Sequence, residues 1–366
     1  MISLFTDISS EMTFGILPIF IIYELKASSS ILGVIEGIGE ATNYISRVFS
    51  GYISDKVKKR KLFIFIGYLI STISKPLLAL SYNPLDVLII RFSDRIGKGV
   101  RTPARDTLLS ESISKDKIGK AFGIHRSLDQ MGAIIGPLLA SILLSFIGIR
   151  GIFLFSLLPG IIALTFFIFV KEKKVNSKRI EFRLIIKGRF LLLLSIITIF
   201  SLGAFNFSFI LLSAISLGLE DAIIPILYAI INLAHVLISY PSGVLSDRIG
   251  RLKVLIIGFS LFLITSILGF LFFKIEIVIL MAIVYGSYIG IMETVQRAVV
   301  ADYSEEEVRG TAYGIYYLFI GISYLIANIV FGVLWDIFGS YAFLYSIITS
   351  SISIIAMLLL TYLKKV

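Results

Sequence analysis

Residues 254–273 read VLIIGFSLFLITSILGFLFF, and none of these side chains carries a charge. A helix needs about 20 apolar residues to cross the hydrocarbon core of a bilayer. Residues 151–170 and 341–363 are equally free of charge, and residues 62–82 contain a single charge, Lys75. Such long continuous runs are unlike the short alternating segments of a membrane β-barrel. The stretch therefore predicts a chain built from membrane-spanning α-helices.

The composition extends this prediction to the whole chain. Of the 366 residues, 57% are hydrophobic and only 16% are charged, whereas soluble domains carry about 25% charged residues. A soluble fold of this length could not cover so much apolar surface. We expect an all-α membrane protein with twelve transmembrane helices in two pseudo-symmetric six-helix bundles. The expected spans lie near residues 3–25, 29–50, 62–82, 84–110, 121–148, 151–170, 190–217, 221–245, 254–273, 276–300, 311–334 and 341–363.

Basic residues gather after every second expected span. They lie in residues 56–61, 115–120, 171–189 and 248–253, and at the end of the chain. Cytoplasmic loops of membrane proteins carry the excess of Lys and Arg, so both termini are expected to be cytoplasmic and the protein to lie in the cell membrane. The longest basic stretch suggests three parts: a bundle at 1–170, a cytoplasmic linker at 171–189 and a bundle at 190–366. An independent basic binding segment is the alternative for the linker.

Other classes of function lack their sequence signals. There is no cysteine and there are only two histidines, which argues against disulfide chemistry and a structural zinc site. No glycine-rich nucleotide loop, metalloprotease motif or Gly-x-Ser-x-Gly elbow is present. We therefore expect no enzyme, no cofactor and no metal. Because topology explains the net charge of +10, no nucleic-acid partner is expected either. The first apolar run carries Asp7 and Glu11 and lacks a basic start, so no cleaved signal peptide is expected.

Two short segments occur twice in the chain. Residues 51–56, GYISDK, match residues 243–248, GVLSDR, at an offset of 243 − 51 = 192. Residues 119–123, GKAFG, match residues 310–314, GTAYG, at an offset of 310 − 119 = 191. Two separate matches at nearly one offset indicate a duplicated half. Many secondary transporters are built from such repeats, with the substrate site between them.

These motifs resemble the signatures of the major facilitator superfamily (MFS). Gly51-x-x-x-Asp55-Lys56-x-x-Lys59-Arg60 looks like its motif after span 2, with Lys58 at a usual glycine, and residues 243–251 look like a second copy. Arg95-x-x-x-Gly99 resembles the span 4 motif linked to proton transfer. The resemblance implies the twelve-helix MFS fold and transport by alternating access.

The span 5 motif Gly132-x-x-x-Gly136-Pro137-x-x-Ala140 resembles that of the antiporter branch, with Ala140 where glycine is commoner. Gly132 and Gly136 otherwise permit close helix packing, and Pro137 is then a kink. Further strings look like a poorly characterised prokaryotic subgroup of the superfamily. They are residues 6–11 (TDISSE), 36–40 (EGIGE), 94–101 (DRIGKGVR) and 334–336 (LWD).

The repeated loop motifs have a mechanical interpretation. Asp55 and Asp247 can accept hydrogen bonds from helix N-termini or from arginines of neighbouring spans. Such contacts would hold one face of the transporter closed and break as the halves rock; charge that only sets topology is the alternative. The expected gating residues are Gly51, Asp55, Lys56, Arg60, Arg105, Asp106, Gly243, Asp247, Arg248 and Arg251.

Charged residues also interrupt the apolar spans. Those of span 4 recur every three or four residues, so they form one stripe along a helix. A charge at the bilayer centre costs about 2.5–3.5 kcal/mol if it faces lipid, so we expect the stripe to face an interior cavity. The uniformly apolar third, sixth, ninth and twelfth spans suit the lipid-facing periphery. The expected proton and substrate pathway comprises Asp7, Glu11, Glu36, Glu40, Asp94, Arg95, Lys98, Arg101, Arg126 and Asp129.

Intramembrane carboxylates commonly mark ion or proton pathways, although some of these pairs could simply lock helices together. The leading hypothesis is a proton-coupled secondary transporter that exports a drug or small metabolite. Proton-coupled uptake of an anionic metabolite is the alternative, since span 4 is rich in Arg and Lys. A non-transporting membrane sensor is the remaining class. The expected partners are a small-molecule substrate, H⁺ and the lipid bilayer, with the protein acting as a monomer.

Overall fold

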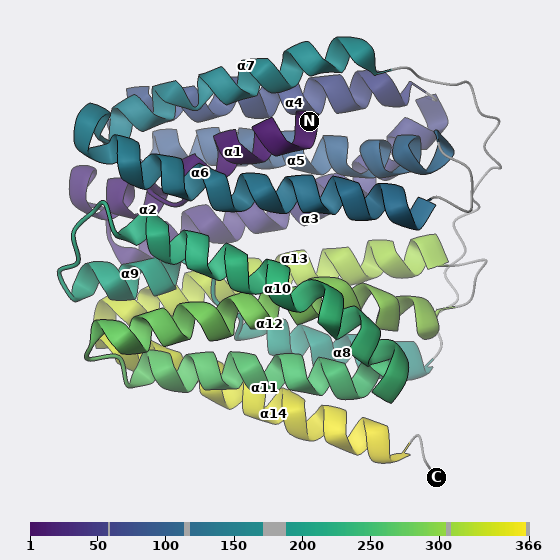
Figure 1. Ribbon diagram of the computed structural model, residues 1–366. Helices are drawn as coiled ribbons and strands as arrows, with labels where there is room; N and C mark the ends of the chain where they lie inside the picture. The colour runs from purple at the N-terminus through teal and green to yellow at the C-terminus, as the bar shows by residue number, and fades with distance from the viewer. Residues whose placement is uncertain (58, 113–117, 171–187, 305–308, 364–366) are drawn as a thin grey trace. The chain divides into compact units, whose positions relative to one another are not determined.

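The computed structural model describes residues 1–57, 59–112, 118–170, 188–304 and 309–363. Regular structure in these ranges is helical (Figure 1), which confirms the predicted all-α class. The first half contains α1 (Ile2–Phe14), α2 (Leu17–Ile19), a π-helical turn (Phe20–Glu24), α3 (Ser29–Val57), α4 (Arg60–Leu77), α5 (Pro84–Glu111), α6 (Ile118–Phe155) and α7 (Leu157–Phe166). The second half contains α8 (Gly188–Leu202), α9 (Ser208–Ser216), α10 (Ile224–Ile249), α11 (Arg251–Phe270), α12 (Ile275–Asp302), α13 (Arg309–Phe338) and α14 (Ala342–Leu363).

Seven described segments are long and apolar enough to cross a membrane. Two of them, Gly123–Phe169 and Thr311–Tyr362, have 47 and 52 residues, which suffices for two crossings each. Each of these two contains a glycine with positive φ, Gly148 (66°) and Gly339 (58°), where the chain turns from one helix to the next. The charged helices α3 and α5 and the interrupted pair α8–α9 complete the twelve crossings of the described chain.

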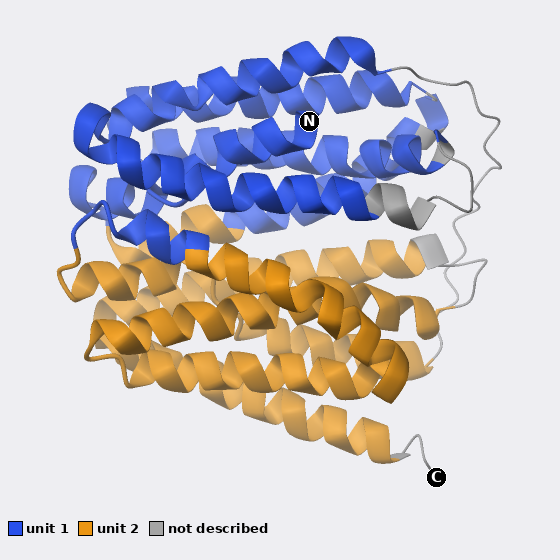
Figure 2. Ribbon diagram, viewed as in Figure 1, with its two compact units in different colours: residues 1–27, 38–179, 220–229 blue, residues 28–37, 180–219, 230–366 orange. Residues whose placement is uncertain are grey.

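The chain forms two compact units (Figure 2). Unit 1 contains residues 1–27, 38–179 and 220–229, and unit 2 contains residues 28–37, 180–219 and 230–366. The first turns of α3 thus belong to unit 2, and those of α10 belong to unit 1. These exchanged segments are themselves related by 220 − 28 = 192 residues, the offset of the sequence repeat. The proposed boundaries at 170 and 190 stay a prediction, because residues 171–187 of the linker lie outside the described residues.

The two units repeat one helix crossing. A Cβ atom placed on Gly99 of α5 would meet the Asn43 carbonyl oxygen of α3 at 2.9 Å. A Cβ atom placed on Gly290 of α12 would meet the His235 carbonyl oxygen of α10 at 2.7 Å. The glycines are 290 − 99 = 191 residues apart, and their partners 235 − 43 = 192. Because only glycine lets backbones approach this closely, the duplication inferred from two loop motifs extends into the packing of the helices.

The first and seventh spans are both interrupted. In span 1, α1 ends before Gly15, whose N–H group donates to the Glu11 carbonyl at 3.1 Å. In span 7, residues 203–207 separate α8 from α9. Backbone groups inside a bilayer need protein partners. Side chains of unit 2 supply them here: Ser346 donates to the Gly203 carbonyl (2.6 Å), Tyr285 donates to the Phe205 carbonyl (3.0 Å), and Asn328 accepts from the Asn206 N–H group (2.9 Å).

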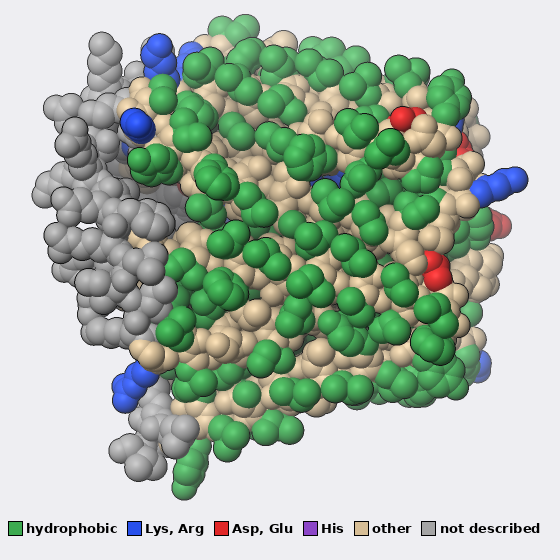
Figure 3. All heavy atoms as spheres, turned by 180° about the vertical axis from the view of Figure 1, so that it is seen from behind, with side chains coloured by type: hydrophobic (Ala, Val, Ile, Leu, Met, Phe, Trp, Pro, Cys, Tyr) green, Lys and Arg blue, Asp and Glu red, His purple; other side chains and the backbone are tan. Residues whose placement is uncertain are grey.

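Hydrophobic side chains cover most of the face drawn in Figure 3, and the few charged side chains visible there lie mainly toward its two ends. Large apolar residues such as Phe146 and Ile168 are 80% and 78% exposed. Water would oppose exposure of so much apolar surface, whereas the hydrocarbon of a bilayer solvates it. The protein is therefore a membrane protein.

Candidate transport site in unit 1

The charged stripe of α5 is held close to two neighbouring helices. The helix starts with a reciprocal capping box between Asn83 and Asp86. Further along, a Cβ atom on Gly97 would meet the Gly67 carbonyl oxygen of α4 at 2.7 Å, and Gly99 contacts α3 as described above. The central charged side chains of the stripe are buried: Arg91, Asp94, Arg95 and Arg101 are 1%, 3%, 4% and 4% exposed.

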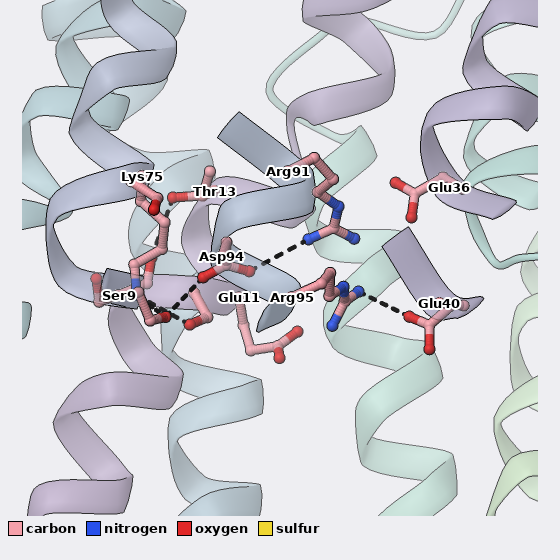
Figure 4. Close-up of polar contacts among 12 residues, drawn as sticks. Ser9, Glu11, Thr13, Glu36, Glu40, Lys75, Arg91, Asp94 and Arg95 are labelled. Carbon is pink, nitrogen blue, oxygen red and sulfur yellow. Dashed lines mark hydrogen bonds and ion pairs between the residues drawn. The ribbon is translucent and has the colours of Figure 1, made fainter. Parts of the chain in front are cut away.

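Ion pairs compensate part of this charge (Figure 4). Arg95 Nη2 lies 2.8 Å from Glu40 Oε1 of α3, and Arg91 Nη1 lies 3.8 Å from Asp94 Oδ2. Both guanidinium groups also lie over the ring of Phe14, at 3.8 Å for Arg91 and 5.0 Å for Arg95. An aromatic face stabilises a cation that has been removed from water. The α5 stripe is thus paired with α3 on one side and stacked on α1.

Asp94 also belongs to a hydrogen-bond chain that runs to α4. Ser71 Oγ donates to Asp94 Oδ1 at 2.6 Å. Lys75 Nζ, only one turn further along α4, donates to Ser71 Oγ at 3.3 Å and to Ser10 Oγ of α1 at 3.0 Å. Lys75 is 1% exposed. We expected its span at the lipid-facing periphery, yet this side chain lies in the centre of the polar network, and the lone charge in that span was the only signal of it.

The two carboxylates of α1 face this network. Tyr228, at the start of α10 but in unit 1, donates a hydrogen bond to Glu11. Asp7 interacts electrostatically with Asp129 of α6, with Lys98 and Arg101 of α5, and with Glu11. The structure therefore brings Asp7, Glu11, Glu40 and the α5 residues together in one unit, and their role in a transport pathway stays a prediction.

The predicted span 5 residues occupy different surroundings. Asp129 accepts a hydrogen bond from Ser3 of α1 and lies 3.4 Å from His125 Nδ1. Arg126 is exposed. Glycines of the same helix face α1: a Cβ atom on Gly132 would meet the Leu4 carbonyl oxygen at 2.6 Å, and one on Gly136 the Ile8 carbonyl oxygen at 2.8 Å. Pro137 contacts the turn after α1 near Gly15.

Glu36 lies in the part of α3 that belongs to unit 2. It is 1% exposed, and Ser208 Oγ at the start of α9 donates to its Oε1 at 3.3 Å. The interruption of span 7 therefore places a helix N-terminus beside this carboxylate, where the positive end of the helix dipole favours negative charge.

The expected gating residues form local contacts in both units. Arg105 and Asp106 form an ion pair at 2.8 Å, Gly51 faces Pro103 of α5, and Arg60 is buried. Lys56 is exposed, and the Asp55 side chain lies outside the described part of the structure.

In the second copy, Arg251 Nη1 bonds Asp302 at 2.6 Å and the Ala298 carbonyl at 2.9 Å, which ties the start of α11 to the end of α12. Asp247 lies 3.9 Å from the same arginine. Gly243 faces Thr294 of α12, while Arg248 is exposed. No three His, Asp or Glu side chains gather into a metal-ion cluster within the residues searched.

Comparison with known proteins decides the family. The family model described as "Major Facilitator Superfamily" matches residues 1–234 and 191–366. The chain belongs to the major facilitator superfamily. An uncharacterised MFS-type transporter of Methanocaldococcus jannaschii is 38% identical over 374 residues, covering 99% of this chain and 92% of that protein. The resemblance stated from the motifs, and the conclusion that the protein is a transporter and not an enzyme, are thereby confirmed.

Solved structures of MFS transporters share the fold. A mutant of the nucleoside transporter NupG superposes with a TM-score of 0.79 at 14% identity, covering 98% of this chain and 100% of that one. The D-xylose-proton symporter gives a TM-score of 0.75 at 15% identity, covering 97% and 95%. Identities this low show the fold alone, so the substrates of those two proteins are not assigned to this chain.

Proposed function

We propose that this MFS transporter couples proton movement to the export of a drug or small metabolite by alternating access. The observation that carries the proposal is the buried network of unit 1. Carboxylates and cations from α1, α3, α4 and α5 meet there away from lipid. A bundle needs no such network to fold, because paired buried charges are often no more stabilising than apolar residues. Intramembrane carboxylates of this kind usually carry ions or protons.

Protonation of the network could also control whether its arginines bind a substrate. Glu40 holds Arg95, and Asp94 holds Arg91. Protonation of either carboxylate would release a guanidinium group to bind an anionic or hydrogen-bonding solute. Proton-dependent uptake of an anionic metabolite is the second candidate, favoured by the buried cations Lys75, Arg91, Arg95 and Arg101 of α4 and α5.

The direction of export rests on the resemblance of residues 132–140 to the antiporter motif. Gly132 and Gly136 bring α6 into backbone contact with α1, the helix that carries Asp7 and Glu11. The basic segments of the sequence further support a location in the cell membrane, with both termini in the cytoplasm. The titrating proton is then taken up from the outside and released inside the cell.

The test uses purified protein in liposomes that contain a trapped pH dye. A panel of drugs, neutral metabolites and organic anions is applied, and wild type is compared with Asp7→Asn and Glu11→Gln. The control is Glu276→Gln, which alters an exposed carboxylate at the start of α12. We expect solute-dependent proton movement that both pathway variants lose and the control keeps. Solute movement without protons, unchanged in both variants, would refute the coupling.

A further inference from the structure

Lys75 is the buried charge that the proposed pathway does not explain. It lies on α4 between Ser71 and Pro76, in a helix whose other described charges stand at its first two residues, Arg60 and Lys61. Its Nζ atom reaches two hydroxyl groups, Ser10 of α1 and Ser71 of α4. A cation at this depth needs compensation, and the compensating carboxylate is reached through one of those hydroxyls.

The hydrogen bonds along this path all point the same way. Lys75 Nζ donates to Ser71 Oγ at 3.3 Å, and Ser71 Oγ donates to Asp94 Oδ1 at 2.6 Å. An ammonium group, a hydroxyl group and a carboxylate are therefore aligned as donor, donor–acceptor and acceptor. A hydroxyl in that position can accept one proton while it gives up another, because it carries both a donor and lone pairs.

We propose that Lys75, Ser71 and Asp94 form a buried proton relay that changes the charge state of Asp94 during transport. One Nζ–H bond of the ammonium breaks as an Oγ–H bond forms on Ser71. The original Oγ–H bond of Ser71 breaks as an Oδ1–H bond forms on Asp94. The products are a neutral amine and a neutral carboxylic acid. Uptake of one H⁺ by the amine restores the ammonium group, so that the relay has bound one proton and holds it on Asp94.

The consequence falls on Arg91. Its Nη1 atom lies 3.8 Å from Oδ2 of the same carboxylate, so protonation of Asp94 removes one counter-charge of a guanidinium group that is 1% exposed. The arginine then favours an anionic or strongly accepting group of a solute. This inference rests on the proposed function and deepens it. It names Asp94 as the residue that binds the proton and Arg91 as the cation whose pairing changes when the proton is bound.

Charged groups from two packed helices act on the relay. Lys75 interacts electrostatically with Asp94 and Arg101 of α5 and with Asp7 and Glu11 of α1, and Asp94 interacts with Lys75 and with Arg95 and Arg91 of its own helix. Within the described part of α6, Asp129 is engaged with Ser3, and Arg150 with Glu24. The helix α7, LLPGIIALTF, contributes no ionisable side chain. The pH response of the relay is therefore shaped by α1 and α5.

The experiment needs no substrate. Wild-type protein in liposomes is subjected to a pH jump, and infrared difference spectra follow the carbonyl stretch of newly formed carboxylic acid. We expect a band that Asp94→Asn lacks. Ser71→Ala, which keeps both charges, should slow its appearance by about tenfold or more, and Ser71→Thr should restore the rate. The control is Ser74→Ala, because the Ser74 hydroxyl is buried on the same helix but donates only to its own Ile70 carbonyl.

Ser71→Ala with wild-type kinetics would overturn the relay, as would a band that persists in Asp94→Asn. If Asp94→Asn fails to fold, Lys75→Met/Asp94→Asn removes both charges together, and loss of the band in that variant gives the same support. If the band behaves as expected but no solute drives proton movement in the dye assay, the relay stands and the proposed coupling fails. If coupling is observed while Ser71→Ala is normal, the coupling stands and the relay fails.

Discussion

The two units share one crossing of helices, α3 with α5 in unit 1 and α10 with α12 in unit 2, but the side chains at the two crossings differ. In unit 1, Arg95 of α5 pairs with Glu40 of α3. The repeat offsets of 191 and 192 carry these positions to Gly286 of α12 and Asn232 of α10. A Cβ atom on Gly286 would lie 2.2 Å from the Ile231 carbonyl oxygen, so no larger side chain fits there. The ion pair of one half is replaced by backbone contact in the other.

Aromatic rings occupy much of the interior of unit 2 instead. Phe200 stacks on Phe259 with ring centres 3.9 Å apart, and Phe205 touches Phe331 and Phe343 at 4.8 and 5.1 Å. Such pairs contribute about 0.5–1.5 kcal/mol each beyond their buried area, and none of them can titrate. Duplication therefore preserved the packing, while the buried arginine–carboxylate pairs Arg95–Glu40 and Arg91–Asp94 lie in unit 1 and the α10–α12 crossing of unit 2 carries a His235–Glu293 pair.

The largest expected effect comes from breaking the ion pair that distinguishes unit 1. Arg95→Met leaves Glu40 without its partner, and removal of one member of a buried pair costs about 3–5 kcal/mol. Unfolding in mixed SDS micelles measures the loss. The double variant Glu40→Gln/Arg95→Met should recover most of it. Equal stability of the single and double variants would show that the pair does not compensate a buried charge.

The shared crossing predicts equal sensitivity in the two units. Gly99→Leu and Gly290→Leu force a side chain against backbone in each, and overpacking typically costs about 1–3 kcal/mol. The same unfolding assay should give similar losses for both. Gly123→Ala is the control, because a Cβ atom there meets nothing within 4 Å. A large loss for one crossing alone would contradict the structural equivalence of the repeats.

A smaller effect is expected at the start of α3, where unit 2 caps the helix. Asp336 accepts hydrogen bonds from the Ser29 and Ser30 N–H groups at 2.8 Å each. Partial burial acts to raise the pKa of Asp336, but the hydrogen bonds from Ser30 and Ser29 outweigh it and hold the pKa below 3.8. A lowered folded pKa means that the stabilisation is complete above the unfolded value and is lost as pH falls through the folded one.

Asp336→Asn should therefore cost about 1 kcal/mol at neutral pH, as loss of a helix cap does, and much less once the pH has fallen below the folded pKa. Hydrogen exchange of residues 29–32 reports the loss locally. The protection of these amides in wild type relative to Asp336→Asn should therefore shrink as the pH falls, because the protonated carboxyl group no longer caps the helix. A difference between wild type and variant that does not change with pH would exclude the carboxylate as the cap.

The smallest effect belongs to the loop contact of unit 2. Arg251 and Asp302 are 33% and 48% exposed, and exposed pairs contribute about 0.2–1 kcal/mol. Arg251→Gln should thus barely alter unfolding, and added salt should reduce the difference further. Solute transport, in contrast, should respond if this contact closes a gate. Unchanged transport would limit Arg251 to a structural role.

The helices and their repetition can be predicted from the amino-acid sequence alone. Uncharged runs such as residues 254–273 are too apolar for water and long enough for a bilayer, so length and hydropathy fix their structure whatever their neighbours are. The two loop copies at 51–56 and 243–248 are 192 residues apart. The glycines at the equivalent helix crossings, Gly99 and Gly290, are separated by nearly the same number of residues, 191. The i, i+3 and i, i+4 spacing of span 4 placed its charges on one face before any partner was known.

Which charged side chains contact one another could not be predicted from the sequence and is known from the packing of the helices. Lys75 lies in a span that the hydropathy pattern assigns to the periphery, but its hydrogen bonds reach α1 and, through Ser71, α5. Glu36 and Glu40 are one turn apart in sequence, yet Glu36 contacts Ser208 of unit 2 and Glu40 contacts Arg95 of unit 1. Hydropathy and residue spacing describe one helix at a time and do not predict which residues of other helices it contacts. Whether a buried charge is a pathway residue depends on atoms contributed by helices far away in the chain, and their contacts are fixed only when the helices pack.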